Sequence, residues 1–169
     1  MGGGREVLIL FKKVPPTKRL VLATILAVFS AILQAAGGLL PGIGFLISPF
    51  STLTVLLAVL LSFRYGLLSY LLTILLLVFI EPGELLVFPF TTGLLGLTLG
   101  WTLLTFKKRF PIIVINGIVL TAGICTALYG LKFSVLGPLI STVPAVAPFL
   151  VIYAFALSYS WFWLELSLF

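Results

Sequence analysis

Six long apolar stretches constrain the fold of this chain more than any other feature of its sequence. The hydrocarbon core of a bilayer is about 30 Å thick, and a helix that rises about 1.5 Å per residue crosses it with roughly 20 apolar residues. Charged residues make up only 8% of the 169 residues, which is too few to cover the surface of a soluble domain of this size. We therefore predict an integral membrane protein.

The six stretches predict an all-α fold, a bundle of six transmembrane helices. We expect residues 1–17 to form a short basic lead-in and residues 18–169 to form one transmembrane domain without a convincing internal repeat. Pro49 falls in the first turn of the second expected helix, where a missing N–H does little damage. The expected helices are 20–36, 45–63, 65–80, 85–106, 110–131 and 143–164.

Basic residues indicate how the bundle is oriented in the membrane. If the chain crosses at every apolar stretch, all of its Lys and Arg residues except Lys132 fall on one side. Cytoplasmic connections carry an excess of basic residues. We therefore predict that both termini are cytoplasmic and that Lys132 faces outward. The basic residues on the inner side are Arg5, Lys12, Lys13, Lys18, Arg19, Arg64, Lys107, Lys108 and Arg109.

Few side chains in the sequence can carry enzyme chemistry. The chain has no His and no Asp, one cysteine (Cys125), and four acids, which are Glu6, Glu81, Glu84 and Glu165. A His-containing catalytic triad and a His-ligated metal site are therefore excluded. We expect no enzymatic activity, no metal site and no cofactor. The placement of the basic residues along one side of a membrane argues against nucleic acid as a partner.

Three alanines on the first expected helix recur at a spacing of four residues. Ala23, Ala27 and Ala31 form one slightly slanted stripe, because each step of four residues turns a helix by about 40°. In lipid, faces of small residues let two helix backbones approach closely. The stripe indicates either docking of a partner helix or packing inside the bundle.

The same region carries a resemblance to a known family. The basic pair Lys18-Arg19 followed by the alanine-striped helix resembles the opening of the substrate-binding S-components of energy-coupling factor transporters. The run Leu-Leu-Ser-Phe-Arg-Tyr-Gly-Leu-Leu-Ser-Tyr over residues 60–70 is similar to the short basic, aromatic and glycine-containing inner turn that follows their second helix. The chain length, the six expected helices and the inner termini also agree with that family.

The resemblance implies a specific role. An S-component captures a vitamin or a related micronutrient at the outer face of a prokaryotic cytoplasmic membrane, and then docks on a transmembrane coupling subunit driven by two cytoplasmic ATPases. By this resemblance, Ala23, Ala27 and Ala31 would form the docking surface. The ligand would bind in the outer half of helices four to six, beneath the loop between helices one and two. The chain has no P-loop pattern, in keeping with ATP chemistry that belongs to the partners.

Polar residues in the outer half of the bundle are the candidates for a ligand site. Gln34 lies near the outer end of the first helix, Glu84 in the outer turn between helices three and four, and Thr92 in the outer half of helix four. Tyr129 is placed to stack on a ring-shaped ligand, and Lys132 to pair with an acid across the outer mouth. The same residues also have explanations without a ligand. Glu84 would lie in a solvated turn, the Thr92 hydroxyl would bond to its own helix, and Tyr129 would belong to an interfacial aromatic belt.

Three further patterns concern access and packing. The glycine-rich connection 37–44 is expected to be mobile and to cover the site as a lid, or to be a simple linker. Asn116 is an amide well inside the fifth helix and is expected to form hydrogen bonds between helices. Gly93, Gly96 and Gly100 form a small-residue face that is expected to pack against a neighbouring helix.

Two functions from different classes remain open. Substrate capture for a multi-subunit importer is favoured by the alanine stripe and by the family resemblance. A structural scaffold, similar to the rod-shape membrane components of the cell-wall elongation machinery, is favoured by the low polar content of the outer half. Under the first hypothesis, that low content predicts a largely apolar or aromatic ligand held by a few polar contacts.

The expected topology can be tested by labelling single cysteines. In a Cys125→Ala background, Lys108→Cys and Lys132→Cys should react with an impermeant thiol reagent from opposite sides of the membrane, because they fall on opposite sides of the fifth helix. Reaction of both cysteines from the same side would contradict the six-helix topology.

Overall fold

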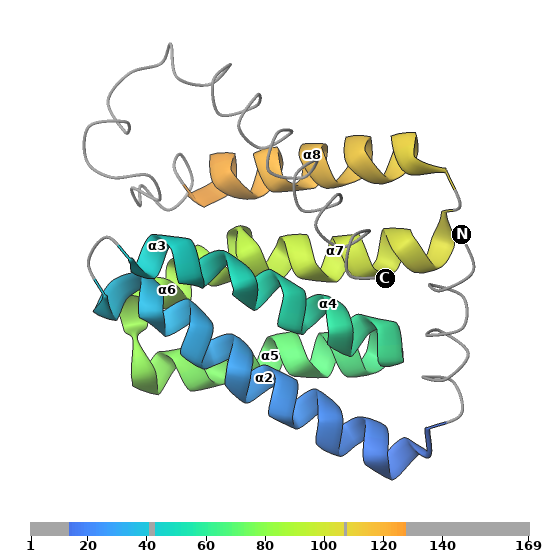
Figure 1. The fold of residues 1–169 in the computed structure, drawn as a ribbon. Coiled ribbons are helices and arrows are strands. Elements are labelled where there is room, and N and C mark those ends of the chain that lie inside the picture. Colours follow the sequence, from blue (N-terminus) through green and yellow to red (C-terminus); the bar gives the residue numbers. More distant parts are fainter. Residues whose placement is uncertain (1–13, 41–42, 107, 128–169) are drawn as a thin grey trace.

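The computed structural model of the protein describes residues 14–40, 43–106 and 108–127, and every regular element in this part of the chain is a helix (Figure 1). Each of the first five expected helices corresponds to a helical segment, and the sixth, 143–164, lies outside the described residues. The elements are α2 (Pro16–Leu39), α3 (Gly44–Ile47), η1 (Ser48–Phe50), α4 (Ser51–Leu61), α5 (Phe63–Ile80), α6 (Pro82–Val87), η2 (Phe88–Phe90), α7 (Thr92–Thr105) and α8 (Arg109–Cys125).

The lengths and compositions of these helices fit a membrane protein. Three helical segments are long and apolar enough to cross a membrane, namely Pro16–Leu39, Phe63–Ile80 and Pro82–Thr105. Two shorter apolar segments accompany them, Ser48–Leu61 and Phe110–Cys125. Large apolar side chains such as Phe79 and Phe110 point outward and are mostly exposed, as expected where the surrounding solvent is lipid.

Two of the segments are interrupted at equivalent places. In each, a 3₁₀ turn contains a Pro-Phe pair and leads into a longer helix that begins with Ser or Thr: Pro49-Phe50 precedes α4, and Pro89-Phe90 precedes α7. Proline lacks an N–H and cannot donate the i−4 hydrogen bond of a continuous α-helix. Pro49 therefore lies in η1, between α3 and α4, and not in the first turn of one continuous helix. This short repeat was not among the features expected from the sequence.

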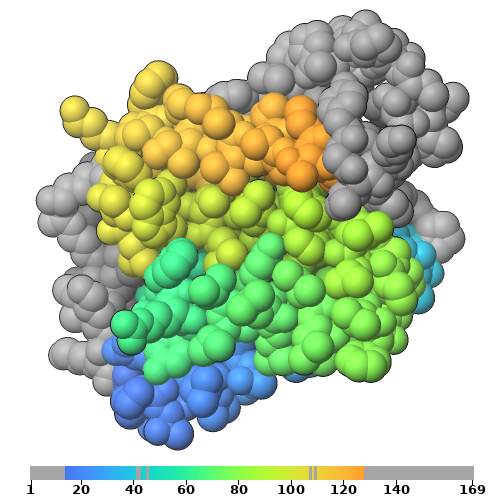
Figure 2. All heavy atoms as spheres, turned by 180° about the vertical axis from the view of Figure 1, so that it is seen from behind, coloured from blue at the N-terminus to red at the C-terminus, as the bar shows by residue number. Residues whose placement is uncertain are grey.

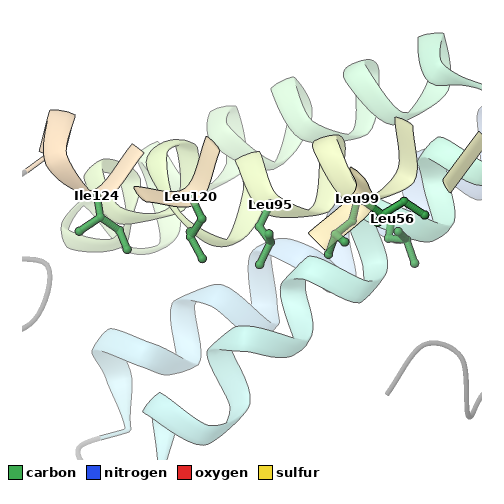
Figure 3. Packing of buried hydrophobic residues seen from close by; sticks show 6 residues of the cluster. Leu56, Leu95, Leu99, Leu120 and Ile124 are labelled. Carbon is green, nitrogen blue, oxygen red and sulfur yellow. The ribbon is translucent and has the colours of Figure 1, made fainter. Parts of the chain in front are cut away.

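Glycines bring the two helices that follow these interruptions close together. A Cβ atom at Gly96 of α7 would lie 2.7 Å from the Thr52 carbonyl oxygen, and one at Gly100 would lie 2.5 Å from Cβ of Val59. The prediction that the glycine face of this helix packs against a neighbouring helix is confirmed for Gly96 and Gly100, and the neighbour is α4. Gly93 instead lies against Phe88 of η2. On the far side of α7 from α2, α8 completes the bundle (Figures 1 and 2). Leucine and isoleucine side chains of α4, α7 and α8 form a buried core there, including Leu56, Leu95, Leu99, Leu120 and Ile124 (Figure 3).

The alanine stripe lies inside the bundle. Ala23, Ala27 and Ala31 are 2%, 0% and 0% exposed, and α2 packs against both α5 and α4. Thr73 of α5 donates a hydrogen bond to the carbonyl oxygen of Ala27 at 3.2 Å. This corrects the expectation of an outward-facing docking stripe. The small side chains allow α2 to approach α4 and α5 closely. Packing inside the bundle was the second explanation that the spacing of the alanines allowed.

One end of the bundle is held together by a very short connection. A single residue, Ser62, separates α4 from α5. Arg19 of α2 donates to the carbonyl oxygen of Leu61, the last residue of α4, at 3.4 Å. Tyr65 of α5 donates in turn to the carbonyl oxygen of Pro16 at 3.3 Å. Three helices are therefore joined at this basic end, which the positive-inside rule predicts to be cytoplasmic.

Enlarging the alanine stripe should destabilise the isolated protein. We expect Ala27→Leu to lower the free energy of unfolding by about 1–3 kcal/mol, because the added carbons have no room between packed helices. Val28→Leu, at a neighbouring position that is 42% exposed, is the matched control and should have little effect. Thermal unfolding of the detergent-solubilised variants measures the difference, and equal melting temperatures would contradict internal packing of the stripe.

Candidate functional site

Four polar side chains meet near the end of the bundle opposite the Ser62 turn. Gln34 of α2 is fully buried and lies at their centre. Its Oε1 atom accepts hydrogen bonds from Ser51 Oγ at 2.8 Å and from Thr92 Oγ1 at 2.6 Å, and its Nε2 atom donates to Glu84 Oε2 at 2.6 Å. These residues, which we call the Gln34 cluster, connect α2, α4, α6 and α7. The carboxylate of Glu84 accepts from the amide nitrogen, so the amide oxygen faces the two hydroxyls, which donate to it.

The two interrupted helices place the hydroxyls of this cluster. Ser51 is the first residue of α4 and directly follows Phe50, while Thr92 is the first residue of α7 and is separated from Phe90 by Thr91. Because α4 and α7 pack closely, both hydroxyls reach the same oxygen of Gln34. Ser51 was not among the ligand-site residues predicted from the sequence. The shared Pro-Phe-(Ser/Thr)-Thr pattern marks the region of both hydroxyls, but it aligns Ser51 with Thr91 and does not identify the pair that meets at Gln34.

Other hydroxyls bind backbone carbonyls at the same interruptions. Thr52 Oγ1 donates to the carbonyl oxygen of Thr92 at 3.2 Å, and Tyr70 Oη donates to the carbonyl oxygen of Pro89 at 3.1 Å. Ser30 Oγ donates to the carbonyl oxygen of Ser51 at 3.4 Å. A helix interruption at membrane depth is tolerated only where the freed backbone groups find partners. Of these three bonds, the one from Tyr70 satisfies a carbonyl oxygen within a Pro-Phe turn.

Two glycines in the last turn of α2 make room for two carboxylates, one at the junction of α5 and α6 and one in α6. A Cβ atom at Gly37 would lie 2.8 Å from Glu84 Oε1, and a Cβ atom at Gly38 would lie 3.0 Å from Glu81 Cγ. Any larger residue at position 37 would push Glu84 away from Gln34. These glycines therefore serve the approach of two acidic side chains.

The structure differs from the expected lid over residues 37–44. Helix α2 continues to Leu39, so Gly37 and Gly38 belong to a helix and not to a loop. Gly44 already begins α3, and a Cβ atom there would collide with the carbonyl oxygen of Ala36. Residues 41 and 42 lie outside the described part. Gly44 lies against α2, while Leu40 and Ile43 are exposed, and it is Glu84 of α6 that contacts Gln34.

Three of the five predicted ligand-site residues lie together. Gln34, Glu84 and Thr92 are joined by direct hydrogen bonds, while Tyr129 and Lys132 lie outside the described residues. The alternative interpretation of Thr92, a hydroxyl bonded to its own helix, does not apply to it. It does apply to Thr91, whose hydroxyl donates to the carbonyl oxygen of Val87 at 2.7 Å.

A second buried amide links α7 and α8. Asn116 Nδ2 donates to Thr102 Oγ1 at 2.9 Å and to the carbonyl oxygen of Ile112 at 2.8 Å. The predicted role of Asn116 as a polar link between helices is confirmed. Its Oδ1 atom and Ser69 Oγ are the buried side-chain atoms of the described residues that have no hydrogen-bond partner. Neither atom belongs to the Gln34 cluster, so every buried polar side-chain atom of that cluster has a hydrogen-bond partner.

The composition of the Gln34 cluster limits what it can do chemically. It contains one amide, two hydroxyls and one half-buried carboxylate. In the described part of the chain, no group of three or more His, Cys, Asp and Glu side chains lies together to hold a metal ion. Such a cluster is suited to binding a polar group of a small molecule or to locking four helical segments together.

Comparison of the chain with known protein families, with curated proteins and with solved structures gives no match in any of the three. The likeness to S-components therefore rests on short motifs and on the expected architecture.

The interhelical bond of Thr92 should contribute measurably to stability. We expect Thr92→Val to lower the free energy of unfolding by about 0.6–1.7 kcal/mol more than Thr98→Val does. The reason is that Thr92 bonds across to Gln34, whereas Thr98 on the same helix bonds only carbonyl oxygens of α7. Thermal unfolding in detergent compares the two variants. If both melt alike, the link to Gln34 carries no stability.

Proposed function

We propose that the chain is a membrane-embedded substrate-capture subunit that binds a small molecule at the Gln34 cluster. The supporting observation is a polar cluster with one carboxylate, placed where two interrupted helices meet inside an otherwise apolar bundle. Polar and ionisable groups at membrane depth are costly and mark functional sites. Pairs of Pro-interrupted hydrophobic segments in corresponding positions are a recurring sign of a transport binding site.

The position of the cluster supports capture from outside. The basic residues Lys18, Arg64 and Lys108 lie at or near the ends of helices α2, α5 and α8 that point away from it. If this basic end is cytoplasmic, as the positive-inside rule predicts, the Gln34 cluster lies in the outer half of the membrane. A vitamin or a related micronutrient would then reach it from the outer face of a multi-pass protein in a prokaryotic cytoplasmic membrane.

The proposal includes partners that carry the energy of transport. A transmembrane coupling subunit, and through it two cytoplasmic ATPases, would complete the importer, as the resemblance to S-components implies. The coupling subunit must contact a surface other than the alanine stripe, because Ala23, Ala27 and Ala31 are buried. Membrane lipid covers the remaining apolar faces.

One observation favours a second function, a structural scaffold. The side chains of the Gln34 cluster bind one another, and the unpartnered buried atoms of the described residues belong to Ser69 and Asn116. A closed network of this kind would also serve to hold a rigid membrane scaffold in shape. The two functions differ in whether a small molecule stabilises the protein.

A thermal-shift screen of the detergent-solubilised protein separates the two. A panel of vitamins and their precursors should contain a compound that stabilises the fold by about 2.7 kcal/mol at a hundredfold excess over its dissociation constant. Mass spectrometry of the purified protein should find the same compound bound.

The shift should disappear in Gln34→Leu and persist in the control Thr98→Val, which lies on α7 outside the cluster. No shift with any compound, together with stable co-purification of cell-wall assembly proteins, would refute substrate capture in favour of the scaffold.

A further inference from the structure

Helix α6 is held less firmly than the other elements around the Gln34 cluster. None of its residues, Pro82–Val87, is buried, whereas α2, α4 and α7 each bury several residues. The backbone leaves helical geometry on both sides of the α6–η2 segment, with φ −151° and ψ 88° at Glu81 and φ −124° and ψ −97° at Thr91. The segment between these two points is therefore a short unit that packing fixes only in part.

The two ends of this unit are held in different ways. At its end, Phe88 is fully buried and stacks on Tyr70 with ring centroids 5.6 Å apart, and the Tyr70 hydroxyl donates to the carbonyl oxygen of Pro89. At its start, Leu85 is only partly buried against the apolar cluster that includes Ala35, and polar contacts add to this packing. Glu84 accepts the 2.6 Å hydrogen bond from Gln34 and lies against Gly37. The end of the unit is anchored, and its start is held to α2 by polar contacts.

We propose that α6 is a gate over the Gln34 cluster and that the bond between Glu84 and Gln34 is its latch. When the bond breaks, α6 lifts about the anchored residues of η2, and a path opens from the outer surface to the hydroxyls of Ser51 and Thr92. The gate regulates access to the proposed ligand site, so its biological meaning rests on the proposed function. The movement of α6 itself does not depend on the proposed function.

A pair of buried alanines on α2 can report the opening. Ala35 belongs to an apolar cluster that Leu85 of α6 packs against, whereas Ala23 lies about 18 Å away along the same helix. Both are 2% exposed and neither belongs to the Gln34 cluster. In a Cys125→Ala background, Ala35→Cys is the reporter beneath the gate and Ala23→Cys is its matched control.

Removal of the latch should expose only the reporter beneath the gate. Glu84→Ala should raise the rate at which a small water-soluble thiol reagent labels Ala35→Cys by at least about tenfold, the factor that loss of one charge-assisted hydrogen bond represents. The rate at Ala23→Cys should stay unchanged. Glu84→Gln should leave both rates close to those of the parent protein, because its side-chain oxygen can still accept the bond from Gln34. An unchanged rate at Ala35→Cys, or an equal rise at both positions, would overturn the proposal.

A crosslink tests the gate without changing Glu84. A Cβ atom at Gly38 lies 3.0 Å from Glu81 Cγ, so cysteines at these positions would have Cβ atoms no more than about 4.5 Å apart, within reach of a disulfide. In Gly38→Cys/Glu81→Cys, with Cys125→Ala, oxidation should slow hydrogen exchange of the α6 amides by at least about tenfold and reduction should restore it. Exchange in α5 should not respond. Exchange in α6 that is independent of the disulfide would show that α6 does not open.

Neither experiment uses a ligand. A latch that fails these tests leaves the outcome of the ligand screen untouched, and a protein that binds no ligand can still have a gate.

Discussion

The need to satisfy every backbone polar group inside lipid is the constraint on which the rest of this structure depends. Two prolines interrupt two apolar helices, and each interruption frees carbonyl groups that water cannot reach. The Tyr70 hydroxyl, from a neighbouring helix, binds one carbonyl oxygen within one of the two Pro-Phe turns, that of Pro89. The hydroxyls of Ser30 and Thr52 bind carbonyl oxygens in the first turn of the helices that follow the two interruptions. The helices can approach closely enough for these bonds because glycine and alanine line their contacts. The Gln34 cluster lies at the same place, because Ser51 and Thr92 begin the helices that follow the two interruptions.

Much of the fold could be predicted from the sequence, because helix formation in lipid is a local property. Apolar length alone located the five helical segments that the structure describes, and hydropathy together with position identified Gln34, Glu84 and Thr92 as polar residues in one half of the bundle. Their direct bonds could not be predicted. Gln34 and Thr92 are 58 residues apart, and the packing of both α2 and α7 against α4 brings them together.

The incorrect expectations have a common physical cause. Spacing shows that Ala23, Ala27 and Ala31 share one face of a helix, but it does not show whether that face meets another part of the same chain or a different protein. Glycine in the sequence likewise does not show whether it loosens a loop or makes room for a neighbour. Gly37 and Gly38 make room for a neighbour, since both lie in helix α2. The side chains of Glu84 and Glu81 occupy the space that larger side chains at these positions would fill.

The single-residue connection at Ser62 makes the bundle mechanically unequal at its two ends. There, Arg19 and Tyr65 bind α2 to the turn between α4 and α5, so the three helices share a fixed pivot. Any splaying of these helices must increase the cross-sectional area of the protein at the opposite end only. Such a change does work against lateral pressure in one leaflet of the bilayer and almost none in the other. The conformational equilibrium of this protein should therefore depend on the asymmetry of the membrane around it, with lipids that crowd the leaflet near Gln34 favouring the compact form.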